Sequence, residues 1–259
     1  MPAIREGYIY WHAYPFNGEL ELHDPFVLDA ALNLTFSLDD RFGVPHKQVG
    51  SENHRILSCP VTHLATARSP QVLSQRDVPG TTRSAIPRLA ANGVGAITVG
   101  VNGGSTPPNV PRAFLWRDPV SNVSIPAMWH PRGYGGISFE DAVILPGSSH
   151  AIVFDWEGDN AGPPSAATVA GDFASLAKTF PGATIVASTL DDFLPFLEAA
   201  APLLPVLENE VADTWMHGGG SDPQKVRRGH RGAAAEATVR RTPHASLCSW
   251  RGSRSARWS

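Results

Sequence analysis

The chain has few cysteines, few charged residues and no long apolar run, and each shortage excludes a class of protein. Its two cysteines, Cys59 and Cys248, fall in two segments that look foreign to the rest of the sequence, so no disulfide framework or cysteine-based metal site is expected. No apolar run approaches the roughly eighteen residues that a membrane-spanning helix needs. Residues 1–10 also lack the basic start and apolar core of a secretory signal peptide. We therefore expect a globular domain with no membrane partner.

Charge is scarce and unevenly distributed. Asp, Glu, Lys and Arg make up 17% of the chain, and the net charge is −3. Residues 226–259 contain eight Arg, no Lys and one Glu, a local charge of +7 that leaves −10 on the preceding residues. A basic arm on an acidic body is typical of some nucleic-acid and membrane proteins. This arm has no apolar period, and its first half has no aromatic residue. We therefore interpret it as a disordered basic tail with no nucleic-acid partner.

Glycine and proline are plentiful, with 24 and 23 residues, which favours a loop-rich α/β domain over a helical bundle. Strand-like and helix-like segments alternate along the chain. We expect strands at 8–11, 72–74, 96–101, 151–154 and 184–187, a hairpin from 114–116 and 123–129, and helices at 25–41, 83–92, 165–180 and 190–200. This alternation predicts a parallel sheet with functional side chains at the carboxyl ends of its strands.

Two carboxylates follow apolar, strand-like runs and stand beside turn-forming residues. Asp77 precedes a Val-Pro-Gly turn, and Asp159 lies in a Gly-Asp-Asn turn. Asp beside Pro or Gly is common in loops, so either position by itself also fits an ordinary turn. Barrel enzymes keep their catalytic residues on loops of this kind, and hydrolysis of a glycosidic bond needs two carboxyl groups. Asp77 and Asp159 are therefore the candidate catalytic pair.

Several short motifs follow one another in a specific order between residues 8 and 225. They lie at 11–16, 28–32, 41–45, the turn after 77, 114–118, 129–136, 158–160 and 187–193. This order resembles the catalytic domain of the α-mannosidases of glycoside hydrolase family 38, in a divergent branch of that group. The resemblance implies a (β/α) barrel of the glycoside hydrolase/deacetylase kind. That barrel would be seven-stranded in the parent and incomplete here, spanning residues 1–225 with an aberrant insertion at 49–71.

The resemblance also implies roles for individual residues. Asp77 would be both the nucleophile and a zinc ligand. The family's acid/base is the second Asp of a Gly-Asp-Asp motif, and this chain has Asn160 at that position, so Asp159 would take the role. If the resemblance holds, the carboxyl groups of Asp77 and Asp159 lie roughly 5–7 Å apart in one cleft. The expected sugar-binding residues are Trp116, Arg117, Tyr134 and Asn160. Trp129 and Trp156 also lie near predicted strand ends, although core packing is the more ordinary role for Trp129.

The zinc that the resemblance implies has few candidate ligands. The family's first two ligands come from a His-x-Asp sequence, which occurs nowhere in this chain. A later His ligand of the family matches His217 loosely, so Asp77 and His217 are the predicted metal ligands. His12 follows a predicted strand and is a further candidate, but a lone His is more often a hydrogen-bonded structural residue.

Three functions fit these observations. The first is a carbohydrate-active hydrolase of the zinc-dependent, retaining α-mannosidase type, either active or a partial copy. The second is a metal-dependent carbohydrate deacetylase in which Asp77 activates a metal-bound water, although the chain has no His-x-x-x-His pair. The third is a non-catalytic sugar-binding remnant, favoured by Asn160 and by the missing His-x-Asp.

Overall fold

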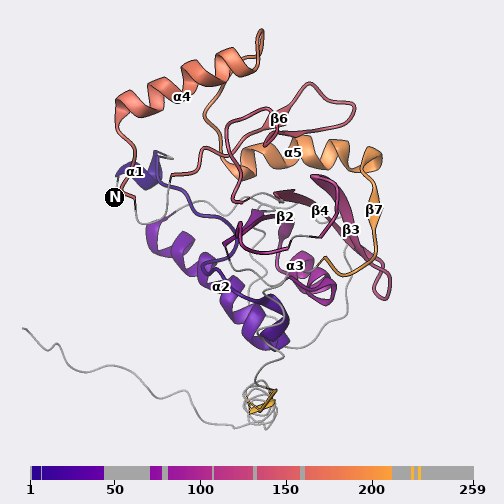
Figure 1. The fold of residues 1–259 in the computed structure, drawn as a ribbon. Helices are drawn as coiled ribbons and strands as arrows, with labels where there is room; N and C mark the ends of the chain where they lie inside the picture. Colours follow the sequence, from indigo (N-terminus) through magenta and orange to yellow (C-terminus); the bar gives the residue numbers. More distant parts are fainter. Residues whose placement is uncertain are drawn as a thin grey trace, which may run out of the picture.

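The computed structural model describes residues 2–6, 8–43, 71–77, 81–106, 108–130, 133–157, 161–211, 223–224 and 227–228. These residues form a mixed α/β fold around a five-stranded, mostly parallel sheet (Figure 1). Its order is β1 (Gln71–Asp77), β2 (Val94–Val101), β4 (Val123–His130), β3 (Ala113–Asp118) and β7 (Val206–Leu207). β1, β2 and β4 are parallel, and β3 is antiparallel to β4 and parallel to β7.

Helices cover both faces of this sheet. On one face, α2 (Pro25–Phe42) and α3 (Ile86–Ala91) pack their apolar side chains against β2, β3 and β4. On the other face, α5 (Leu190–Ala200) packs against the sheet at residues such as Val72 of β1 and Met128 of β4. The sheet is covered on both faces, as is usual for parallel sheets, and the strand predicted at 96–101 is buried as expected.

The predicted helices and the predicted hairpin are confirmed, and their ends have recognisable causes. α2 begins after Asp24, whose side chain accepts a hydrogen bond from the Phe26 amide, and it ends at Gly43 in the left-handed region with φ 64°. α4 (Ala166–Thr179) begins after Ser165, which caps the Thr168 amide. The shorter helices are α1 (Pro2–Arg5), η1 (Leu20–Leu22), η2 (Arg83–Ala85) and η3 (Ala201–Leu203).

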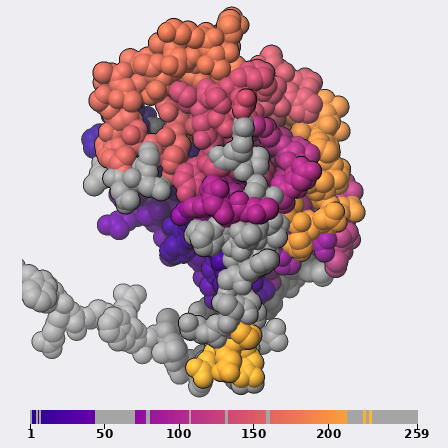
Figure 2. All heavy atoms as spheres, viewed as in Figure 1, coloured from indigo at the N-terminus to yellow at the C-terminus, as the bar shows by residue number. Residues whose placement is uncertain are grey.

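Three strand predictions differ from the structure. Residues 8–11 and 184–187 are not strands. The predicted strand at 151–154 is reduced to β6 (Ala151–Ile152), which pairs with β5 (Val143–Ile144) in a separate antiparallel sheet. The segment after β6 leads to α4, which projects at the top of Figure 1 and lies on the outer surface in Figure 2. Leu176 is the buried residue of α4.

A loop, rather than the strand predicted at 8–11, satisfies the free edge of β1. His12 Nδ1 accepts a hydrogen bond from the Ser74 amide at 3.3 Å, and Ala13 donates its amide to Val72 at 3.1 Å. The side chain of Asn17 takes the place of a neighbouring strand beside Arg76. Its Oδ1 accepts a hydrogen bond from the Arg76 backbone amide, and its Nδ2 donates one to the Arg76 carbonyl. The described strands therefore form an open sheet, and the (β/α) barrel stays a prediction.

None of the helices in the described ranges is long and apolar enough to span a membrane. The predicted insertion at 49–71 lies outside these ranges, apart from Gln71, the first residue of β1. The predicted basic tail also lies outside them, apart from residues 227–228.

Candidate functional site

Asp77 ends β1 with an unusual backbone conformation. Its φ of 78° lies in the left-handed region, which a non-glycine residue rarely adopts. Asn102, directly after the neighbouring strand β2, holds it in two ways. The Asn102 amide donates to the Asp77 carbonyl at 3.0 Å, and the Asn102 Nδ2 donates to Asp77 Oδ1 at 2.7 Å. Strained residues that their surroundings hold in place cluster at functional sites.

Tyr134 supplies the second donor to the same oxygen. Its hydroxyl lies 2.5 Å from Asp77 Oδ1. The hydrogen bonds from Asn102 and then Tyr134 hold the pKa of Asp77 below its usual range, against a smaller opposing effect of burial. Asp77 is therefore ionised at neutral pH. Two donors therefore hold Oδ1, and no described residue donates to Oδ2.

Two glycines bring Tyr134 close to the sheet edge. A Cβ on Gly100, near the end of β2, would lie 2.7 Å from the Arg76 Cδ and 2.8 Å from the Tyr134 Cα. Gly135 has a φ of 105°, and a Cβ there would lie 2.7 Å from the Phe154 Cβ. A larger side chain at Gly100 would therefore push Tyr134 away from Asp77, or displace the Arg76 side chain from its buried position.

Arg76 lies directly behind this edge and is only 8% exposed. Its guanidinium donates to the carbonyls of Gln75 and Thr98 and to the Thr98 hydroxyl, at 2.8 to 3.1 Å, and it lies 4.8 Å from the ring centre of Phe154. Burial lowers the pKa of Arg76 to about 10. No carboxylate of the described residues forms an ion pair with it. A buried cation with only neutral partners makes the electrostatic potential at this end of the sheet more positive.

His130 ends β4 on the far side of Phe154, with ring centres 4.5 Å apart. It is 2% exposed, and its Nε2 has no hydrogen-bond partner among the described residues. Burial, and then the positive charges of Arg76 and Arg112, lower its pKa to about 3. His12 is also neutral, because burial and Arg76 lower its pKa to about 4, and its Nδ1 accepts backbone hydrogen bonds. Neither imidazole belongs to a cluster of metal-binding side chains among the described residues.

An exposed aromatic ring borders Tyr134. The ring centres of Tyr134 and Trp156 are 5.2 Å apart, with planes inclined by 63°. Trp156 is 47% exposed, although it carries the largest apolar side chain. Asp77, Tyr134 and Trp156 thus lie next to one another at the end of the sheet where the parallel strands β1, β2 and β4 finish.

The structure separates two predicted site residues from Asp77. Trp116 is 0% exposed within the core and donates its Nε1 hydrogen to the Asn209 carbonyl at 2.9 Å, so neither face of its ring is open to a sugar. Arg117 pairs with Ser124 at the beginning of β4 and forms an ion pair with Glu208 at 3.5 Å. Because β3 runs antiparallel to β4, both residues lie toward the other end of the sheet, where the parallel strands begin.

The remaining predicted residues, Asp159, Asn160 and His217, lie outside the described residues. The separation of Asp77 and Asp159 therefore stays a prediction. Within the described ranges, no three His, Cys, Asp or Glu side chains gather in a way that would hold a metal ion. Asp77 has an amide and a phenol as neighbours, so the described residues offer one zinc ligand and do not fit a zinc site.

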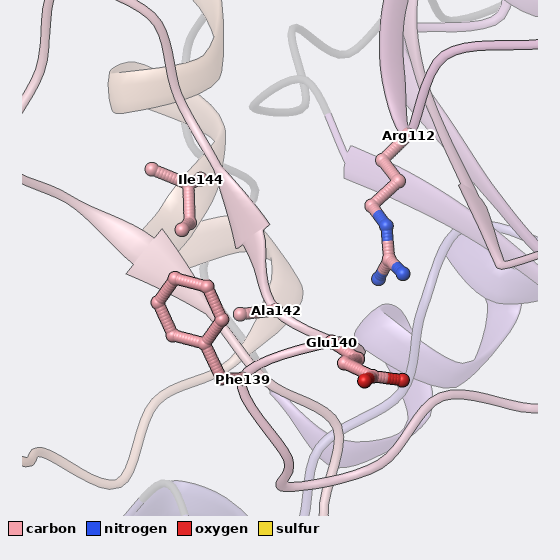
Figure 3. Close-up of a pocket in the computed structure, with 5 residues that line it drawn as sticks. All are labelled: Arg112, Phe139, Glu140, Ala142 and Ile144. Carbon is pink, nitrogen blue, oxygen red and sulfur yellow. The ribbon is translucent and has the colours of Figure 1, made fainter. Parts of the chain in front are cut away.

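A separate pocket of about 370 Å³ lies beside the first residue of β3. Figure 3 shows Arg112 and Glu140 on one side of it and Phe139 and Ile144 on the other, with Ala142 between them. None of the predicted site residues lines it. We place the candidate site at Asp77 because the strained, ionised and partly unliganded carboxylate lies there.

Sequence reasoning missed Asn102. The available signal was its position, a polar residue directly after the buried strand 96–101 and before Gly103-Gly104. A comparison of the chain with protein-family models and with curated proteins finds no match. The resemblance to α-mannosidases therefore depends on the order of the motifs alone.

Proposed function

We propose that this chain is a carbohydrate-active hydrolase domain of the retaining α-mannosidase type, with Asp77 as its nucleophile. The observation that carries the proposal is the state of the Asp77 carboxylate. It is ionised, it is fixed through Oδ1 by Asn102 and Tyr134, and its Oδ2 receives no hydrogen bond from the described residues. A glycosidase nucleophile needs all three properties, since one oxygen must attack the anomeric carbon in a fixed direction.

A retaining reaction also needs a carboxyl group that protonates the leaving oxygen and then activates water. Asp159 is the proposed acid/base, and it stands three residues after Trp156 in the sequence. Neither Tyr134 nor Asn102 substitutes for it, because both already donate to the nucleophile. In the family that the motif order resembles, zinc holds sugar hydroxyls. Since the described residues offer it one ligand, we derive no step through the metal.

The test compares the wild-type chain with Asp77→Asn on an aryl α-mannoside, with added zinc and with a chelator. We expect wild-type turnover and a loss of at least a hundredfold in Asp77→Asn, with the melting temperature changed by only a few degrees. Asp172→Asn, on the projecting helix α4, is the matched control and should keep full activity. Equal turnover in Asp77→Asn and the wild type would refute the role of Asp77.

A non-catalytic sugar-binding module is the second candidate, because Asn160 stands where the family has its acid/base. An amide does not exchange a proton at neutral pH, so this substitution removes the family's own proton donor. Saturable binding of methyl α-mannoside without hydrolysis would select this candidate. Release of acetate from N-acetylated sugars would instead indicate the deacetylase.

A further inference from the structure

We infer that Trp156 is the stacking platform of a binding subsite for one neutral pyranose ring, with a hydroxyl of that sugar donating to Asp77 Oδ2. The inference deepens the proposed function, since it names the ligand class and the residue that binds it at the same site. It concerns binding and needs no turnover.

The platform is continuous with the carboxylate. Tyr134 links the two, because its hydroxyl binds Asp77 Oδ1 at 2.5 Å while its ring lies 5.2 Å from that of Trp156. The two rings are inclined by 63° and pack edge to face. A ligand on the exposed part of the Trp156 ring would lie next to Tyr134, whose hydroxyl binds the Asp77 carboxylate.

A pyranose has the matching chemistry. Its axial C–H groups form an apolar face that packs on an aromatic ring, and its hydroxyls at the rim donate hydrogen bonds. Trp156 is 47% exposed and thus has indole surface available for such a contact. The oxygen Oδ2 has no donor among the described residues, so it is the acceptor that a sugar hydroxyl would complete.

The same pair of groups, an aromatic ring and a carboxylate, also suits an organic cation. The charge behind the site disfavours that ligand. Arg76 is buried without a carboxylate ion pair among the described residues, and it lies close to Tyr134, since both would contact a Cβ on Gly100. The fixed positive charge opposes a second cation, whereas a neutral sugar is indifferent to it. The pairing of Asp77 with two donors further reduces the negative charge that a cation would meet.

The backbone around Trp156 is held in place. Phe154, two residues earlier, packs its ring between the Arg76 guanidinium at 4.8 Å and the His130 ring at 4.5 Å. Its amide also donates to the Gly136 carbonyl at 3.2 Å. A platform needs this kind of support, because a ring that must be ordered on binding loses affinity.

The experiment measures binding of methyl α-mannoside to the full chain by NMR titration of the ligand. We expect Trp156→Ala to weaken binding about tenfold, a change of about 1.4 kcal/mol, and Trp156→Phe to stay within about threefold of the wild type. Phe26→Ala removes an equally exposed aromatic ring from α2 and should leave binding unchanged. Thermal melts of all three variants confirm that each is folded.

The outcomes separate this inference from the proposed function. Unchanged affinity in folded Trp156→Ala would overturn the platform, even if Asp77-dependent hydrolysis is found. Trp156-dependent binding without hydrolysis would support the platform and refute the catalytic proposal. Tetramethylammonium is the competing probe, and displacement of the sugar at comparable concentration would overturn the assignment to a neutral ligand. Equal weakening in Phe26→Ala would also overturn it, because the effect would not be local.

Discussion

Mild acid should destabilise this protein through a histidine that does not touch any predicted catalytic group. His130 is 2% exposed, and burial together with the charges of Arg76 and Arg112 lowers its pKa to about 3, with Asp141 opposing weakly. In the unfolded chain the same side chain has a pKa near 6.5. The unfolded state therefore binds a proton first as the pH falls.

The sign and the size of the effect follow from these two pKa values. A base whose pKa is depressed in the folded state contributes stability that is fully present above about pH 6.5 and is lost as the pH falls toward 3. Between pH 7 and pH 5 the unfolded chain gains about 0.7 proton at this position, while the folded chain gains almost none. The free energy of unfolding should fall by about 2 kcal/mol from His130 alone. Carboxylates such as Asp77 titrate mainly below about pH 4 and contribute little in this window.

Urea denaturation at pH 7 and pH 5 measures this loss, with His130→Gln as the comparison. His12 adds a similar effect in both proteins, since its pKa is lowered to about 4, so the difference between the two proteins isolates His130. The wild type should lose about 2 kcal/mol more than His130→Gln between the two pH values. The same loss in both proteins would show that His130 is already protonated, or is accessible to water, in the folded state, and would refute the reasoning.

Two further predictions concern the packing around Asp77. Gly100→Ala should destabilise the protein by about 1–3 kcal/mol, because its Cβ would meet the backbone of Tyr134 as well as the side chain of Arg76. A thermal melt measures this cost, and an unchanged melting temperature would mean that Tyr134 moves freely. Tyr134→Phe removes one of the two donors to the carboxylate, so the pKa of Asp77 should rise toward its ordinary value. The carboxyl carbon signal of Asp77, followed by NMR from pH 2 to 7, reports this shift, and an unchanged midpoint would contradict it.

Local signals in the sequence predicted most of the elements. The apolar run at 96–101 predicted the strand that the structure shows as β2, and the predicted hairpin corresponds to β3 and β4. The caps of α2 and α4 lie at Asp24 and Ser165, whose short polar side chains prefer such positions. These signals depend on a few neighbouring residues, so a single sequence is enough to find them.

The strand predicted at 8–11 failed for a reason that is not local. The edge of β1 is satisfied by the side chains of His12 and Asn17 rather than by another strand. Apolar character shows that a segment prefers to be buried, but it does not specify which partner supplies hydrogen bonds to an edge. Residues 184–187 have the same limitation, because they have strand-like composition and no strand partner within the described ranges.

The candidate site was predictable in part. Asp77 follows an apolar run and stands at a turn, and the structure places it at the carboxyl end of β1 as predicted. The positions of Trp116 and Arg117 also followed from the predicted hairpin. If its second strand is parallel to 96–101, the first strand runs the other way and ends at the opposite edge. The sequence could not predict the contact between Tyr134 and Asp77, because this contact depends on how the loop after β4 folds back across Gly100.

Three polar residues in unusual environments gather at the carboxyl ends of the parallel strands. At the amino edge, Arg117 pairs with Glu208 at 3.5 Å, so charge there is neutralised within the chain. At the carboxyl edge, Asp77 is strained, Arg76 is buried without an ion pair among the described residues, and His130 has a buried nitrogen without a partner there. Strained backbone and buried polar groups without partners often gather at functional sites. Their proximity to Asp77 is the physical reason for placing the proposed site at this end of the sheet.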